Sequence, residues 1–273
     1  MENYEREEAR LLTSLFPSIT AQMRGMLSGL YLAATALAPA EAREKDPELD
    51  RRAARLDQNY YQLLRLVNSM SAAARLSAAV PPPMQDRDLA GIVKEICGEA
   101  EPLARLLKLE LRVRCASERL VCALDEEAIR QVMFQLLSNA FKFTAAGGRV
   151  TVSLTQQDGQ ALLEVTDTGC GMDDIQLGTM FERYRHPELR DPPPCGLGLG
   201  LALCFQIAEE HGGCLLAESR VGEGSRFTMR IPVRRTGRPG LSDAKLDYTG
   251  GFNRVLLGLA DALPPEAFSI RNR

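Results

Sequence analysis

The polar face of one expected helix holds the side chains best suited to chemistry in this chain of 273 residues. An amide oxygen such as that of Asn139 can ligate Mg²⁺, which prefers hard oxygen ligands. Lys142 can meet a phosphate as a point charge. Taken alone, a solvated polar stripe is the simpler interpretation. The apolar face carries Ile129, Val132, Met133, Leu136, Leu137 and Ala140 at helical spacing, and the polar face carries Gln131, Gln135, Ser138, Asn139 and Lys142.

A second candidate is Asp167, which ends an expected strand in the stretch EVTDTGCGM. A buried carboxylate at the end of a strand can accept a hydrogen bond from the exocyclic amine of adenine. Gly169 and Gly171 have no Cβ, so the backbone there can approach a flat base closely. By itself the D-x-G-x-G pattern is a common turn and indicates a nucleotide site only weakly.

A third candidate is the run CGLGLGLAL, which places Gly196, Gly198 and Gly200 before an apolar helix. Backbone N–H groups at a helix N-terminus are suited to binding phosphate. The run does not follow a strand of a βαβ unit, which argues against a dinucleotide fold. The polar, proline-broken stretch MFERYRHPELRDPPPC before it is typical of a mobile lid.

The order and spacing of these segments resemble the successive boxes of the histidine-kinase ATPase domain. That domain belongs to a wider group with the gyrase, Hsp90 and MutL ATPases. The boxes together are highly specific, and the match covers about residues 84–233. They read QLLSNAFKFT, DTGCGM, MFERY, GLGLGLAL, HGG and GEGSRFTMRIP.

The resemblance implies that the chain binds ATP and Mg²⁺. Phosphoryl transfer needs mainly positioning and charge neutralisation, which the matched residues can supply. It assigns Asn139 to the Mg²⁺ that bridges the phosphates, Lys142 to a phosphate, and Asp167 to the adenine amine. The remaining assignments are Gly169 and Gly171 to the base pocket, Phe181 to the lid anchor, and Gly196, Gly198 and Gly200 to the phosphates.

The first helix departs from the family pattern at its reactive pair. The family normally has His, an acidic residue, x-Arg and a Pro-Leu pair there. Aligned on Arg24, the stretch TAQMRGML places Ala21 at the histidine and Gln22 at the acidic residue. A methyl group cannot accept a phosphoryl group, and a neutral amide cannot act as a general base. Autophosphorylation on this helix is therefore excluded, although Ala21 falls on the solvent-facing side where an acceptor belongs.

Gln135 is a further departure, because the family commonly has Asn, His or Glu at this position. Gln keeps an amide but moves it by one methylene. That change argues for retained ATP binding and against efficient turnover, and it leaves Gln135 a weak candidate for a catalytic residue. The two histidines, His186 and His211, are expected in loop and helix-capping roles rather than as acceptors.

Seven-residue apolar repeats before residue 80 predict an antiparallel helical hairpin over residues 1–80. One hairpin buries its seam poorly, so we expect two copies to form a four-helix bundle in a homodimer. The alternative is a monomeric hairpin packed on the chain's own downstream domain. Pro17 is expected to start, kink or break the first helix. The repeats include Ile19, Met26 and Ala33 with Met23, Leu30 and Leu37, then Leu49, Leu56 and Leu63 with Ala53, Tyr60 and Val67.

Strands and helices interleave over residues 84–233, with antiparallel hairpins. This pattern predicts an α/β two-layer sandwich with a mixed sheet, so the whole chain is expected to be α+β. Residues 234–273 form a tail that begins as a loop. Its short apolar segment FNRVLLGLADAL is expected to be a helix docked on the preceding domain or the hairpin, with partner binding as the alternative.

Composition excludes several classes of function. The chain has 33 Lys and Arg against 36 Asp and Glu, so its net charge of −3 gives no case for nucleic acid or an anionic membrane. No apolar run reaches the roughly 20 residues that a membrane span needs. The acidic N-terminus MENYEREEAR does not resemble a signal peptide, and a cytoplasmic protein is expected.

The resemblance classes the chain with two-component histidine kinases and leaves two hypotheses. One is a degenerate kinase that regulates a response regulator or another kinase by ATP-dependent contact. The other is an active kinase or ATPase that transfers phosphoryl to a partner protein. A serine kinase of the anti-sigma-factor type shares this ATPase fold, but such proteins lack a long N-terminal hairpin.

Overall fold

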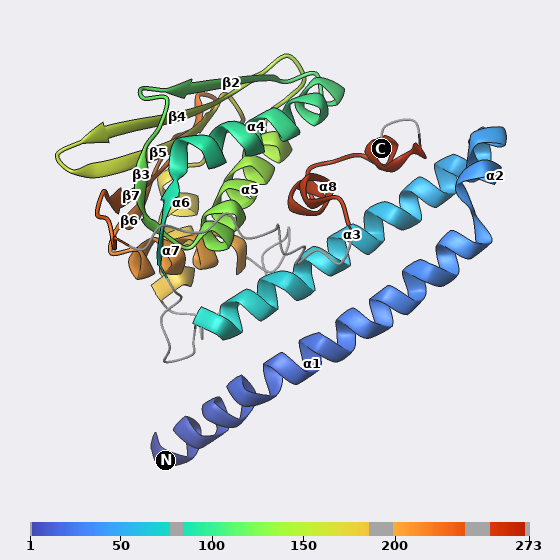
Figure 1. Cartoon of the computed structure of the whole chain (residues 1–273), viewed down its shortest axis with the longest axis horizontal. Coiled ribbons are helices and arrows are strands. Elements are labelled where there is room, and N and C mark those ends of the chain that lie inside the picture. The colour runs from blue at the N-terminus through green and yellow to red at the C-terminus, as the bar shows by residue number, and fades with distance from the viewer. Residues whose placement is uncertain (1, 77–83, 186–198, 238–251, 271–273) are drawn as a thin grey trace. The chain divides into compact units, whose positions relative to one another are not determined.

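The chain forms two compact units (Figure 1). One comprises Met1–Pro81 with Leu263–Arg273, and the other comprises Pro82–Ala262. The structure, a computed structural model, describes residues 2–76, 84–185, 199–237 and 252–270. Side chains are described over 18–72, 84–180, 200–237 and 252–270. The tail expected as one segment is therefore divided between the two units.

The first unit, the hairpin unit, is built on two long helices, α1 (Glu2–Leu37) and α3 (Pro47–Leu76). They run antiparallel and pack against each other, which confirms the predicted hairpin (Figure 1). The Tyr31 and Tyr60 rings stack across it with centroids 4.6 Å apart. Leu27 of α1 and Leu64 and Val67 of α3 are buried beside them. Of the predicted repeat, Tyr60 and Val67 lie in this seam, whereas Met26, Leu30, Leu37, Leu56 and Leu63 are exposed on the single chain.

One local feature of the hairpin unit differs from expectation. Helix α1 continues through Pro17, so this residue neither starts nor breaks it. The connection between the long helices contains a short helix, α2 (Ala40–Lys45). Asp46 then caps α3, because its carboxylate accepts the N–H groups of Glu48 and Leu49 at 2.9 and 3.1 Å.

The second unit, the ATPase unit, is a two-layer sandwich with a mixed sheet, as predicted. Five strands lie in the order β2-β4-β5-β7-β6, where β2 and β4 are parallel and the other pairs antiparallel. A separate antiparallel pair joins β1 (Gln85–Asp88) to β3 (Val121–Leu124). The five strands are β2 (Glu110–Cys115), β4 (Arg149–Gln157), β5 (Gln160–Asp167), β6 (Cys214–Arg220) and β7 (Gly224–Pro232).

Helices α4, α5 and α7 cover one face of the five-stranded sheet (Figure 1). The strands alternate, and in β5 every second residue from Ala161 to Asp167 is buried. Among the described residues, no helix combines the length and apolar character of a membrane span. The helices of this unit are α4 (Leu89–Leu106), α5 (Glu126–Phe143), α6 (Asp174–Arg185), α7 (Leu199–Glu210) and α8 (Arg254–Leu259).

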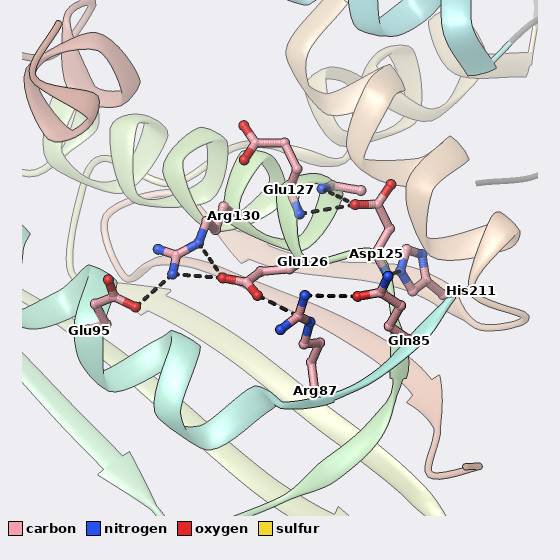
Figure 2. A network of polar contacts seen from close by, with 9 residues as sticks. Gln85, Arg87, Glu95, Asp125, Glu126, Glu127, Arg130 and His211 are labelled. Atoms are coloured by element: carbon pink, nitrogen blue, oxygen red, sulfur yellow. Dashed lines mark hydrogen bonds and ion pairs between the residues drawn. The ribbon is translucent and has the colours of Figure 1, made fainter. Parts of the chain in front are cut away.

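A polar network fixes the start of α5 against its neighbours (Figure 2). The buried Arg130 guanidinium donates to Glu95 of α4 at 2.6 Å and to Glu126 at 3.0 Å. Glu126 also pairs with Arg87 of β1 at 3.5 Å. Because Arg130 is buried, losing either carboxylate would leave part of its charge uncompensated. The network therefore holds α4, α5 and β1 in register.

His211 joins the end of α7 to the start of α5 (Figure 2). Its Nε2 accepts the Asp125 N–H at 3.1 Å, so Nδ1 carries the proton and donates to the Ile207 carbonyl at 2.7 Å. Asp125 in turn caps α5 by accepting from Glu127 N at 3.0 Å. Burial lowers the pKa of His211, so the neutral ring is the native form. This confirms a structural role rather than an acceptor role for His211.

We predict that the free energy of unfolding falls as the pH is lowered from about 7.5 to 5.5. The unfolded chain protonates its histidine at the ordinary pKa, whereas native His211 resists protonation, so acid favours unfolding. The expected slope is at most about 1.4 kcal/mol per pH unit from this group. Urea unfolding at several pH values would measure it.

The control is His211→Gln, which removes the titrating group and leaves the other ionisable groups unchanged. The variant should lose stability at pH 7.5 and show a flatter pH dependence than the wild type. Parallel pH profiles for the two proteins would show that His211 is not the group responsible.

Candidate functional site

Three of the sequence-predicted boxes meet along helix α5. Gln135, Asn139 and Phe143 lie one turn apart on it, spanning about 12 Å. The first turn of α7 lies against Gln135, and the loop after β5 lies against Phe143, whose carbonyl accepts the Cys170 N–H at 3.2 Å. Asn139 stands between these two contacts. The structure thus brings the Asn box, the D-x-G-x-G loop and the last glycine of the Gly-rich run onto one helix.

Asp167 ends β5 as a buried carboxylate, and its hydrogen bonds within the described residues go to one oxygen, Oδ1. Its Oδ1 accepts the N–H groups of Gly169 at 2.8 Å and Ser225 at 3.3 Å. Within the described part of the chain, no hydrogen bond to Oδ2 is found. Burial raises the pKa of Asp167, and the two backbone N–H groups oppose that shift. The side chain is therefore oriented, with one oxygen left to accept a hydrogen bond from a ligand.

The glycines of the D-x-G-x-G loop are required by packing within the protein. A Cβ on Gly169 would lie 2.4 Å from the Phe143 carbonyl oxygen. Gly171 has a φ of +65°, and its Cβ would lie 2.0 Å from the Arg220 carbonyl oxygen. These close approaches set the loop against α5 and the β6–β7 turn. Both glycines therefore meet a structural requirement, and the base-pocket role that the resemblance implies for them stays a prediction.

Gln135 fills the space above Gly200. A Cβ on Gly200 would lie 2.2 Å from the Gln135 amide carbon. The same amide donates from Nε2 to Asn139 Oδ1 at 3.4 Å, a long hydrogen bond. An amide oxygen has two lone pairs, so Asn139 can still ligate a cation. Gln135 therefore connects the start of α7 to the amide of Asn139.

The other predicted residues fall outside this cluster or outside the described residues. Lys142 is exposed, with its Nζ 5.4 Å from the centre of the Phe143 ring. Phe181 lies in α6, which extends to Arg185, so this part of the expected lid is helical. The side chain of Phe181 and the whole of Gly196 and Gly198 lie outside the described residues.

Two functional candidates were missed at the residue level. Ser225 supplies the second N–H to Asp167, and Gly224 packs on the Asp167 carbonyl, where its Cβ would lie only 2.0 Å away. An open depression of about 240 Å³ beside Asp167 is lined in part by Ser219, Gly224 and Ser225. Gly224 and Ser225 belong to the GEGSRF box, but nothing in the sequence shows which backbone group reaches Asp167.

Comparison with known proteins identifies the class of this site. Residues 124–235 match the family described as histidine kinase-, DNA gyrase B-, and HSP90-like ATPase. The chain therefore contains an ATP-binding domain of this class.

The relatives narrow the class to a family. The chain is 34% identical over 143 residues to the sensor histidine kinase RppB of Synechocystis sp., covering 52% of this chain and 32% of RppB. It is 31% identical over 217 residues to the adaptive-response sensory kinase SasA of Rippkaea orientalis, covering 76% of this chain and 55% of SasA. The chain belongs to the histidine-kinase family. It spans between about a third and a half of the length of these two relatives.

Solved structures share the fold. The full-length ShkA structure in complex with AMPPNP matches with a TM-score of 0.65 and 25% identity, over 81% of this chain and 46% of ShkA. The structure of histidine kinase ThkA with response regulator protein TrrA matches with a TM-score of 0.55 and 21% identity, over 87% of this chain and 69% of ThkA. The second likeness bears on the fold alone.

We predict that Gly200→Ala destabilises the ATPase unit by about 1–3 kcal/mol, the usual cost of overpacking. The added methyl group would collide with the Gln135 amide. Urea unfolding should show that Gln135→Ala recovers much of this loss in the double variant, because the two residues share one space. Additive losses in the two variants would contradict the contact.

Proposed function

We propose that this chain is an ATP-dependent regulator of two-component signalling that does not phosphorylate its own first helix. The observation that carries the proposal is Ala21, which is exposed on α1. The neighbouring Gln22 is exposed as well. Arg24, by which the box is aligned, donates to Ser71 of α3 at 2.9 Å. The box therefore keeps its place on the helix but presents a methyl group and a neutral amide to a partner.

The remaining histidines support the absence of a self-acceptor on the hairpin. His211 is buried, and both ring nitrogens are occupied in hydrogen bonds within the protein. An imidazole nitrogen must be free and accessible to attack a phosphoryl group. His186 lies outside the described residues and outside α1.

The geometry of the ATPase unit supports nucleotide binding in one orientation. The Oδ2 atom of Asp167 would accept a hydrogen bond from the adenine amine at one end of the site. The N-terminus of α7, beyond Gly200, carries the positive end of a helix dipole and would face the phosphates. Asn139, between them, would offer its oxygen to Mg²⁺. ATP, when bound, supplies the transferable phosphoryl group, and the protein residues orient it and balance its charge.

We propose a response regulator as the partner, with another kinase as the alternative. The ThkA structure, which holds the response regulator protein TrrA, shares the fold of this chain, and that complex motivates the choice. A second candidate function is transfer of phosphoryl to a partner protein, favoured by the ordered carboxylate of Asp167 and the available oxygen of Asn139. Use of ATP and a response regulator would place the protein in the cytoplasm.

The proposal predicts that purified protein incubated with Mg²⁺ and γ-labelled ATP acquires no acid-labile label. The same protein should bind ATP in a titration that requires Mg²⁺. Asp167→Asn should weaken that binding at least about tenfold, because an amide presents a donor where the carboxylate accepts. Acid-labile label on the wild-type chain would refute the absence of self-phosphorylation, and a wild-type chain that fails to bind ATP would refute the proposed function as a whole.

A matched variant and an added partner separate the two candidate functions. The double substitution Ala21→His with Gln22→Glu supplies an acceptor and an acidic neighbour at the aligned positions. Label on this variant alone would show that the ATPase site can transfer phosphoryl. Label on an added response regulator, with the wild-type chain as catalyst, would instead favour the active-kinase alternative.

We also propose that the hairpin unit dimerises into a four-helix bundle. Apolar side chains on α1 remain on the surface of the single chain, with Met26 69%, Leu30 65% and Leu37 84% exposed. Leu56 and Leu63 on α3 are about half exposed. An apolar stripe along two adjacent helices is unfavourable in water and is buried by a second copy.

We predict that Met26→Glu with Leu30→Glu converts the protein from a dimer to a monomer. The new carboxylates would have to be buried at the dimer interface at a high desolvation cost. Size-exclusion chromatography with light scattering would give the mass. The matched control is Ile175→Glu, an exposed apolar residue of α6 in the ATPase unit, which should leave the mass unchanged. A monomeric wild type would contradict the dimer.

A further inference from the structure

The tail carries two docking segments that belong to different units. The first centres on α8, which packs on α5 and α4 within the ATPase unit. Its residues Val255, Leu256 and Leu259 are buried. Gly258 lies so close to Phe134 of α5 that a Cβ there would be 2.4 Å from the ring. Phe134 and Gly258 thus form a close and specific contact that a larger residue would break.

The second docking segment, residues 263–270, lies in the hairpin unit. It includes the short helix η1 (Pro265–Phe268), which packs on α3. Phe268 is fully buried, and its ring lies 5.3 Å from that of Tyr61. The carbonyl of Leu263, the first residue of the segment, accepts from Gln58 Nε2 at 2.7 Å.

A buried charge cluster completes this second attachment. Arg43 of α2 pairs with Asp50 and Asp57 of α3, each at 2.8 Å, and its side chain is 4% exposed. The tail supplies two further partners, since the Phe268 carbonyl accepts from Arg43 Nη2 at 3.1 Å and the Ile270 N–H donates to Asp50 Oδ1 at 3.2 Å. Buried charges need their hydrogen-bonding capacity filled. The tail backbone fills part of that of Arg43 and Asp50.

The two docking segments meet at the peptide bond between Ala262 and Leu263. Ala262 N donates to the Leu259 carbonyl at 2.9 Å, and the carbonyl of the next residue, Leu263, accepts a hydrogen bond from Gln58. The attachment to the ATPase unit therefore ends at Ala262 and the attachment to the hairpin unit begins at Leu263, with no linker between them. We propose that residues 252–270 act as a strap, a second covalent connection that limits how far the ATPase unit can move from the hairpin unit.

The strap gives this chain a means of control that is independent of an acceptor histidine. A partner that displaces residues 263–270 from α3 would lengthen the connection without disturbing the fold of the ATPase unit. The two attachments differ in chemistry, because α8 is held by apolar packing and residues 263–270 by a buried charge cluster as well. The second attachment is therefore the one expected to respond to a competing polar or charged peptide.

The sharpest test lengthens the strap and leaves both attachments intact. A flexible Gly/Ser insertion of about 12 residues between Ala262 and Leu263 adds roughly 20 Å of reach. Small-angle X-ray scattering on the full chain, at matched oligomeric state, should show a larger radius of gyration and maximum dimension than the wild type. The control places the same insertion at the β4–β5 turn, after Asp158, where it should add only its own small contribution.

Hydrogen exchange gives an independent measurement of the two attachments. Phe268→Ser should speed exchange over residues 263–270 while α8 keeps its protection, and it should expand the scattering profile as the insertion does. Unchanged scattering in both altered proteins, or wild-type residues 263–270 that exchange freely, would overturn the strap. ATP titration of the same proteins reports on the proposed function separately, because a failure to bind ATP leaves the scattering result standing.

Discussion

Helix α5 must bury one face in the sandwich while its other face carries the amides of the proposed ligand site, and the ATPase unit is organised around that division. Its buried face includes Met133, Leu136 and Leu137. Its start is fixed by the cap at Asp125, and its last turn contacts the loop after β5. A helix held at both ends cannot rotate to bury its polar face. The amides of Gln135 and Asn139 are consequently presented by the fold and not by local flexibility.

This division explains why much of the fold could be predicted from the sequence. Apolar residues at helical spacing in α5 and strict alternation in β5 reflect burial on one side, so periodicity reveals both elements. Strand β1 reads QDRD and all four residues are half-buried, so no alternation marks it. Its pairing with β3 is a tertiary effect. The helical part of the expected lid was missed because its prolines begin only at Pro187, after α6 ends.

The candidate site shows a sharper limit. Residue types indicated Asn139, Asp167 and Gly200, because their chemistry suits a nucleotide. The contacts among them join residues far apart in the chain, such as Gln135 with Gly200 and Asp167 with Ser225. No local pattern encodes those contacts. The packing reasons for Gly169 and Gly171 were equally hidden, since a backbone carbonyl that approaches a glycine leaves no mark in the sequence.

The charge cluster at Arg43 has a consequence for the order in which the protein folds. Helices α1 to α3 are synthesised before the ATPase unit. The Phe268 carbonyl and the Ile270 N–H, which complete the hydrogen bonding of Arg43 and Asp50, are synthesised after it. Domains usually fold in the order of their synthesis. Here Arg43 in the hairpin unit of the growing chain lacks one of its hydrogen-bond partners until the ATPase unit has been synthesised. A chain cut short before Phe268 would therefore lack these two hydrogen bonds, so completion of the hairpin unit depends on synthesis through the ATPase unit.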